Sequence, residues 1–266
     1  MTIEHAMLTS FLRRGIAVLV ALGIFGLSGA CSTKPRYAYD PVLLSSPYAN
    51  EREVIWAVAP FRNESGVSFA DELRVTDAMV SQIVQTENIT ALPLNRSLEA
   101  MRTLGLPAIE TQAQALQLAR HLNADAVLVG SITSWNPYDP PILGLNLVLF
   151  GRTGTMDLLD QTDFNPRSLQ TAPSDSGFRT EQRTPGQAIN QVSAMYDASN
   201  GRVRSQIQNY AHARFDPESA MGWQRYTQSM ARFEEFACFQ ALSELLDKER
   251  QRLTERTQTQ TTRTTR

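Results

Sequence analysis

Short apolar runs alternate along this chain with amphipathic segments, and the pattern predicts an α/β domain. Ala124 to Trp135 reads A-D-A-V-L-V-G-S-I-T-S-W, a short apolar, β-branched run without a helical period. The preceding segment, Thr111 to Leu122, has that period, and Thr111 with Gln114 fits a capping box. A helix that ends at Asn123 and passes directly into a buried strand is half of an α/β unit. We therefore expect this strand to be central to the fold.

The same patterns predict further elements on both sides of the central strand. Strands are expected over 54–61, 89–94, 142–152 and 188–196, and helices over 96–104, with Asn95 as the cap, and 202–214. A further helix is expected to begin at a capping box of Ser68 and Asp71 and to end near Thr86. Its apolar side would carry Phe69, Leu73, Val80, Ile83 and Val84. The fold class is therefore α/β, with a small mixed sheet flanked by helices.

A long aromatic helix is predicted near the C-terminus. Asp216-Pro217-Glu218 supplies a cap, a proline at the first position and an acid in the first turn, and the helix is expected to reach Asp247. The apolar positions that recur at helical spacing include several aromatics: Trp223, Tyr226, Phe233, Phe236 and Phe239. This helix is expected either to close the core or to bind a partner, whereas the adjacent acids Glu234 and Glu235 are interpreted as solvated.

The N-terminus has the layout of an export signal. Arg13 and Arg14 precede the apolar run Gly15–Leu27, and small residues lead to Cys31. About 13 apolar residues are too few to span a bilayer, which takes about 20. The ending L-S-G-A-C resembles the lipobox of bacterial lipoproteins, in which the cysteine is acylated. An ordinary signal peptide, or a membrane anchor with a chance cysteine, is the alternative.

These patterns divide the chain into four parts. We expect a lipoprotein signal peptide over 1–30, a lipidated cysteine and tether over 31–50, a single α/β domain over 51–247, and a Thr/Gln/Arg tail over 248–266. A segment at about 153–187, poor in large apolar residues, is predicted to be a flexible insertion in the domain, and the tail is predicted to be disordered.

No constellation of residues points to catalysis, a metal or a cofactor. His121 and His212 have no acid or cysteine at ligand spacing, and Gly130-Ser131 lacks the context of a nucleophile and is interpreted as a tight packing position. Cys238 is expected to be a buried, free thiol in the aromatic helix. The net charge of −2 gives no reason to expect nucleic acid as a ligand.

The best candidate for a partner surface follows the central strand. Trp135, Asn136, Tyr138 and Asp139 lie in a segment with three prolines, at 137, 140 and 141. Such a stiff, partly apolar segment is typical of a surface that meets another protein. The alternative is a loop packed on its own domain.

Two segments resemble one family. V-A-P-F-R-N-E-S-G over 58–66 and L-A-R-H-L-N-A-D-A-V-L-V-G-S-I-T over 118–133 are similar to periplasmic lipoproteins related to the curli-secretion lipoprotein. They also resemble the lipoprotein activators of penicillin-binding proteins and the N-terminal domain of the Tol-system propeller protein. The resemblance implies a small α/β domain in assembly, regulation or export rather than an enzyme.

The favoured function is therefore that of a non-catalytic accessory factor of the cell envelope. It would be held by Cys31, expected at the outer membrane facing the periplasm, and would bind an envelope protein or a second copy of itself. The alternative is an envelope hydrolase or wall-modifying enzyme with an unrecognised site.

Overall fold

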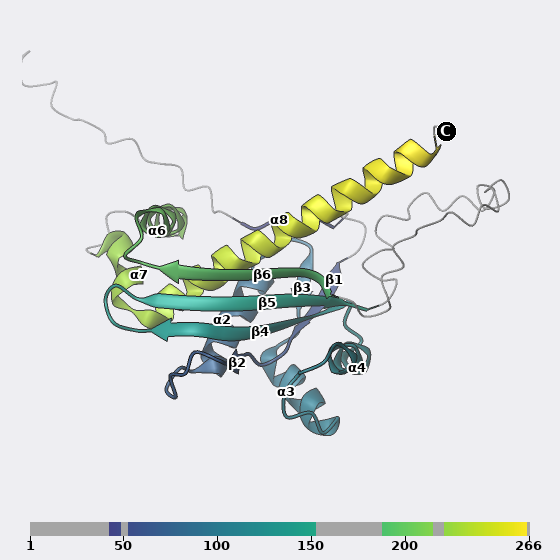
Figure 1. Ribbon diagram of the computed structural model, residues 1–266, viewed down its shortest axis with the longest axis horizontal. Coiled ribbons are helices and arrows are strands. Elements are labelled where there is room, and N and C mark those ends of the chain that lie inside the picture. The colour runs from purple at the N-terminus through teal and green to yellow at the C-terminus, as the bar shows by residue number, and fades with distance from the viewer. Residues whose placement is uncertain (1–42, 49–52, 153–187, 215–220, 265–266) are drawn as a thin grey trace, which may run out of the picture. The chain divides into compact units, whose positions relative to one another are not determined.

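The computed structural model describes residues 43–48, 53–152, 188–214 and 221–264, with side chains as far as Glu255 (Figure 1). All of these residues lie in one compact unit, Pro41–Arg266. The signal segment, Cys31, the insertion at 153–187 and the helix start at 216–218 lie outside the described residues. The predictions made for them stay predictions.

The described strands form one mixed sheet of six strands. They are β1 (Val54–Val58), β2 (Arg62–Asn63), β3 (Ile89–Ala91), β4 (Ala126–Asn136), β5 (Ile142–Gly151) and β6 (Ala188–Asp197). Their order is β3-β1-β4-β5-β6, and β2 pairs with β4 beyond the end of β1. The pairs on the β1 side are parallel, whereas β4–β5 and β5–β6 are antiparallel. The predicted central strand is thus confirmed as β4, where the parallel and antiparallel halves of the sheet meet.

Helices flank the sheet, as the sequence predicts. The α-helices are α2 (Glu72–Val84), α3 (Leu94–Thr103), α4 (Gln112–Leu122), α6 (Gly201–Arg214), α7 (Arg225–Gln228) and α8 (Met230–Thr264), and Gly222–Gln224 forms a 3-10 turn. The capping box of Thr111 and Gln114 is present at α4. Two predicted caps are wrong: Asp71, not Ser68, caps α2, and Asn95 lies inside α3, where Pro93 is the cap residue.

The long aromatic helix differs from its prediction at both ends. Ser229 has an extended backbone, so the helix is broken there between α7 and α8. At the other end α8 continues to Thr264 instead of giving way to a disordered tail at 248. In the first part of this extension Glu249 and Arg252 are buried and form an ion pair with each other, which holds α8 on the domain beyond residue 248. A search for apolar periodicity does not detect such a pair.

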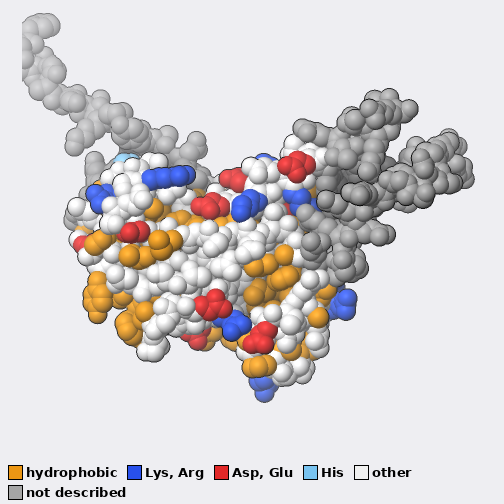
Figure 2. Space-filling model, viewed as in Figure 1, with side chains coloured by type: hydrophobic (Ala, Val, Ile, Leu, Met, Phe, Trp, Pro, Cys, Tyr) orange, Lys and Arg blue, Asp and Glu red, His pale blue; other side chains and the backbone are white. Residues whose placement is uncertain are grey.

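The sheet has one fully covered face and one partly covered face. On the first, the four leucines of β5 at 143, 145, 147 and 149 are fully buried in the cluster that includes residues of α2 and α8. On the second, α3 and α4 pack on the β1–β4 half of the sheet through a smaller cluster. On this face α4 also reaches the end of β5, whereas exposed residues of β6 such as Gln191, Ser193 and Met195 face solvent, and white polar and backbone atoms cross the middle of the face in Figure 2.

Gly130 is a packing position in β4. A Cβ atom there would lie 2.5 Å from the ring of Phe61, which is closer than real Cβ contacts. Phe61 itself is buried just before β2. The interpretation of Gly130 as a tight packing position, rather than part of a nucleophile motif, is therefore confirmed.

We expect Phe233→Ala to lower the stability of the domain strongly. The Phe233 side chain is fully buried, and its ring centroid lies 5.8 Å from that of Phe236. Truncating a buried phenylalanine typically costs about 3–5 kcal/mol, a large share of a total of about 5–15 kcal/mol. Urea unfolding measures the loss, and removal of 257–266 is the control that should leave the midpoint unchanged. An unchanged midpoint for Phe233→Ala would contradict a core role.

Candidate interaction surface and interhelical pocket

Trp135, at the end of β4, is fixed from inside the domain. Its side chain is only 8% exposed, and its indole Nε1 donates a hydrogen bond to Glu234 Oε1 at 3.1 Å. The Glu234 carboxylate is fully buried and also accepts two hydrogen bonds from Arg74, from Nε at 2.8 Å and Nη2 at 2.7 Å. Such bidentate, charge-assisted pairs fix geometry as well as energy. Three elements, α2, β4 and α8, are tied together here.

The surroundings of Glu234 and Trp135 differ from those that the sequence predicts. Glu234 is not on a solvated face, because it is the acceptor that Arg74 and Trp135 share. Trp135, predicted to be part of a partner surface, turns inward and supports that surface instead of forming it.

Phe69 is exposed, which the sequence pattern does not predict. It was expected on the apolar side of a helix, but it precedes the cap of α2 and is 63% exposed. Its ring stands edge-on against the ring of Trp135, with the centroids 5.2 Å apart. Leu73 and Val84, expected on the same apolar side, are exposed as well. The periodicity alone could not show that α2 begins after Phe69.

The remaining predicted surface residues lie in the connection between β4 and β5, at the left end of the sheet in Figure 1. Tyr138 is 73% exposed, and its backbone N–H donates to Asn136 Oδ1 at 3.2 Å, which orders the turn. Asp139 is exposed, whereas Asn136 is half-buried. We call Phe69, Asn136, Tyr138 and Asp139 the Trp135 surface, because each adjoins Trp135 in contact or in sequence.

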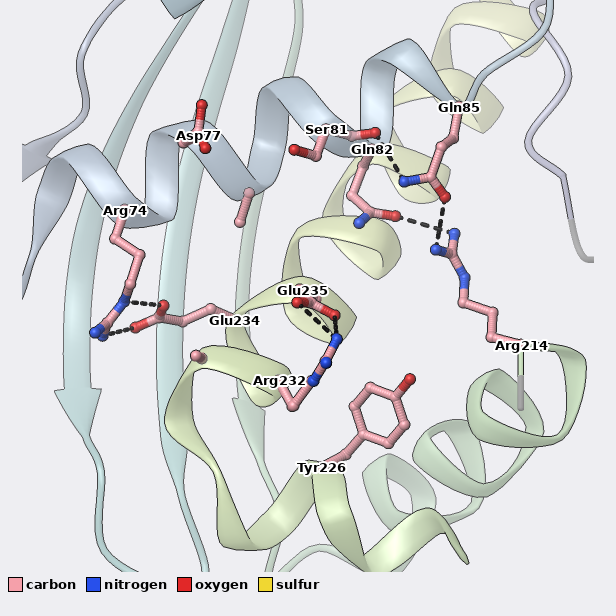
Figure 3. Close-up of a pocket in the computed structure, with 12 residues that line it drawn as sticks. Arg74, Asp77, Ser81, Gln82, Gln85, Arg214, Tyr226, Arg232, Glu234 and Glu235 are labelled. Atoms are coloured by element: carbon pink, nitrogen blue, oxygen red, sulfur yellow. Dashed lines mark hydrogen bonds and ion pairs between the residues drawn. The ribbon is translucent and has the colours of Figure 1, made fainter. Parts of the chain in front are cut away.

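A second feature is a cavity of about 420 Å³ between α2 and the beginning of α8, which we call the interhelical pocket (Figure 3). Arg74 and Glu234 lie at one side of it, and Arg232 with Glu235 lies in the middle. Arg214, at the end of α6, closes the other side. Nothing in the sequence pattern indicated this pocket, since its residues come from four separate helices.

Arg214 is held in an unusual way. Its Nη1 donates to Gln85 Oε1 at 2.7 Å and its Nη2 to Gln82 Oε1 at 3.1 Å. The guanidinium carbon lies 4.6 Å from the centre of the Tyr210 ring and 5.3 Å from that of Phe239. The guanidinium is thus held by neutral oxygens and aromatic faces.

Two buried groups beside the pocket keep their protons at neutral pH. Cys238 is free and fully buried, as predicted, and burial first, with Glu234 and Glu235 adding to it, raises the pKa of its thiol. Burial, with Glu235 adding to it, raises the pKa of Tyr226, which lines the pocket, to about 12. Neither group is therefore a ready anionic nucleophile.

Within 43–48, 53–152, 188–214 and 221–264, no group of three or more His, Cys, Asp and Glu side chains could hold a metal ion. Both histidines of this part, His121 and His212, are exposed. The same residues include no helix long and apolar enough to cross a membrane.

Comparison with protein-family models and with curated proteins finds no significant match. Among solved structures, the chain is similar to the LpoB C-terminal domain from Salmonella enterica, at 15% identity over 55% of this chain and 84% of that chain, with a TM-score of 0.36. Lipoprotein GNA1162 from Neisseria meningitidis matches at 15% identity over 59% and 94%, with a TM-score of 0.35. Hypothetical protein CT253 from Chlamydia trachomatis matches at 10% identity over 76% and 95%, with a TM-score of 0.35. All three likenesses are below 25% identity and below a TM-score of 0.5, and they carry nothing about function.

We expect Glu234→Leu to destabilise the domain by about 1–3 kcal/mol, because Trp135 Nε1 and Arg74 lose their acceptor. Glu235→Leu is the matched control from the next position of α8. Its ion pair with Arg232 is partly exposed, 42% and 35% for the two side chains, and such pairs contribute about 0–1 kcal/mol. Free energies from urea unfolding compare the two variants. Equal losses would mean that Glu234 has no special role.

Proposed function

We propose that the protein is a non-catalytic, lipid-anchored accessory factor of the cell envelope that docks on a protein partner through the Trp135 surface. The observation that carries this proposal is two exposed aromatics, of which Phe69 contacts the fixed Trp135 and Tyr138 follows it by three residues in the β4–β5 connection. Phe69 is 63% exposed and Tyr138 is 73% exposed. Large aromatic side chains are enriched where proteins meet, and they often supply much of the binding energy.

The support beneath this surface favours the same function. Ordering flexible side chains at an interface reduces the affinity. Here Phe69 rests edge-on against Trp135, and Trp135 is held by Glu234, which Arg74 neutralises. A partner would therefore contact an aromatic side chain that packs on an already ordered Trp135.

The lipid anchor is proposed from the lipobox-like sequence before Cys31. The described residues limit the distance between this cysteine and the folded domain. Tyr48 donates from its hydroxyl to Glu249, and Arg250 donates to the backbone oxygen of Ser45, so residues 43–48 are attached to α8. Only 11 residues, 32–42, lie between Cys31 and the attached segment that begins at Leu43. Fully extended, they span about 40 Å. An acylated Cys31 would thus keep the domain close to the membrane, proposed to be the outer one, on its periplasmic side.

We expect Cys31→Ala to abolish acylation and to change the membrane fractionation of the protein. Labelling with a radioactive fatty acid and sedimentation of membranes measure both effects. Cys238→Ala is the control, because the Cys238 thiol is fully buried, and it should be labelled and sediment like the parent. If Cys31→Ala were processed and sedimented like the parent, the proposed anchor would be wrong.

We expect Tyr138→Ala to reduce capture of the partner without changing the stability of the domain. Photo-crosslinking of the intact lipoprotein in its own membranes, followed by purification, measures the capture. Val84→Ala is the matched control, since Val84 is 61% exposed but lies at the last position of α2, at the other end of that helix from Phe69. A crosslinking pattern that Tyr138→Ala and Phe69→Ala both leave intact would refute docking at this surface.

A further inference from the structure

The interhelical pocket has an excess of positive charge at one end. Its two buried or half-buried carboxylates are both engaged: Glu234 by Arg74 and Trp135, and Glu235 by Arg232 through two contacts of 3.0 and 3.1 Å. The third carboxylate of the lining, Asp77, is exposed, and Figure 3 shows it pointing away from the cavity. Among the described residues, Arg214 has no carboxylate partner. Within the described part of the lining, its charge is the one without a carboxylate beside it.

Arg214 is also pre-oriented. Gln85 donates from Nε2 to the backbone oxygen of Ser81 at 3.0 Å, which fixes the amide so that its oxygen faces Arg214. The aromatic faces of Tyr210 and Phe239 hold the guanidinium plane from the side of the core. A guanidinium has five N–H donors, and the two glutamines accept from only two of them. The arrangement leaves donors for a further acceptor.

Gln82 offers a second donor to the pocket. Its side chain is 3% exposed, and its oxygen accepts from Arg214. The amide nitrogen is therefore turned the other way, and Figure 3 shows it pointing into the pocket. No hydrogen bond from this nitrogen is seen among the described residues, and it is not one of their fully buried polar atoms that lack a partner, so solvent reaches it. A ligand oxygen in the pocket can replace water at this donor.

We propose that the interhelical pocket binds a small ligand through an anionic group, a carboxylate or a phosphate, whose oxygens accept from Arg214 and from the Gln82 amide. Both anions share the chemistry that these donors require, namely negative charge and several acceptor lone pairs. The cavity of about 420 Å³ falls in the range of about 300–1,000 Å³ that is usual for small-molecule sites. The ligand is thus larger than the anionic group alone. This site is separate from the Trp135 surface and does not depend on acylation of Cys31.

The test uses the chain from residue 32 onward, which retains the whole compact unit Pro41–Arg266. Side-chain signals of ¹⁵N-labelled glutamine and arginine are followed by NMR during titration with sodium acetate or sodium phosphate, against sodium chloride at equal ionic strength. We expect saturable shifts of the Gln82 amide and of Arg214 Nε with at least one of the two anions. The anion that binds more tightly identifies the ligand group.

Arg214→Gln should weaken this binding by about tenfold or more, because the charge-assisted hydrogen bonds are lost. Arg204→Gln is the matched control on the same helix, since Arg204 is exposed and donates to the backbone oxygen of Ser199. It should bind like the parent. If circular dichroism shows that Arg214→Gln is unfolded, Arg214→Lys replaces it, keeping the charge but removing the planar fork, and binding should again fall.

Three results overturn the proposal. One is the absence of any saturable shift with acetate and phosphate in the parent chain. Another is a shift that persists unchanged in the folded Arg214 variant, since binding would then occur elsewhere. The last is equal loss in Arg204→Gln, which would indicate a general effect of charge on α6. A purely structural role of Arg214, joining α6 to α2, predicts the first result.

Discussion

The buried carboxylate of Glu234 is the constraint on which both functional features depend. A buried charge is unfavourable by several kcal/mol unless it is paired and hydrogen-bonded. Glu234 is fully buried, so Arg74 must lie against it, and Trp135 completes its hydrogen bonds. This requirement fixes the distance between α2 and α8 on one side of the interhelical pocket. It also fixes the ring against which Phe69 rests, so the pocket and the Trp135 surface share one support.

A second buried carboxylate, Glu249, plays the same part further along α8. It accepts hydrogen bonds from Tyr48, Asn190 and Arg252, and burial, with Glu249 adding to it, raises the pKa of the Tyr48 hydroxyl well above its usual value. The cluster joins the first described segment, the beginning of β6 and α8. Because Glu234 and Glu249 are 15 positions apart, about 22 Å along a helix, the aromatic stripe between them is held at both ends by polar contacts.

The sequence predicted what depends on local patterns. β4 and the leucines of β5 follow from strand periodicity, and the Thr111 capping box follows from two residues three positions apart. Sequence patterns do not predict the burial of a charged residue whose partners are distant in the chain. Glu234 and Glu249 look like ordinary solvated acids because Arg74, Trp135 and Tyr48 lie far from them in sequence. The interhelical pocket could not be predicted for the same reason, since it exists only after α2, α6, α7 and α8 have packed together.

The arginines of α8 and its neighbours fall into two kinds: those paired with a carboxylate of the domain, and Arg214, which is held by neutral groups. Arg74, Arg232 and Arg252 each donate to a carboxylate of α8, so their charges are compensated within the domain. Arg214 is held with comparable order, yet by two amide oxygens and two aromatic rings, none of which carries a negative charge. A domain that needed Arg214 only to join α6 to α2 would gain as much from a neutral donor. A cation beside a cavity, with the amide nitrogen of Gln82 facing the same space, is therefore the arrangement on which the proposed anionic ligand depends.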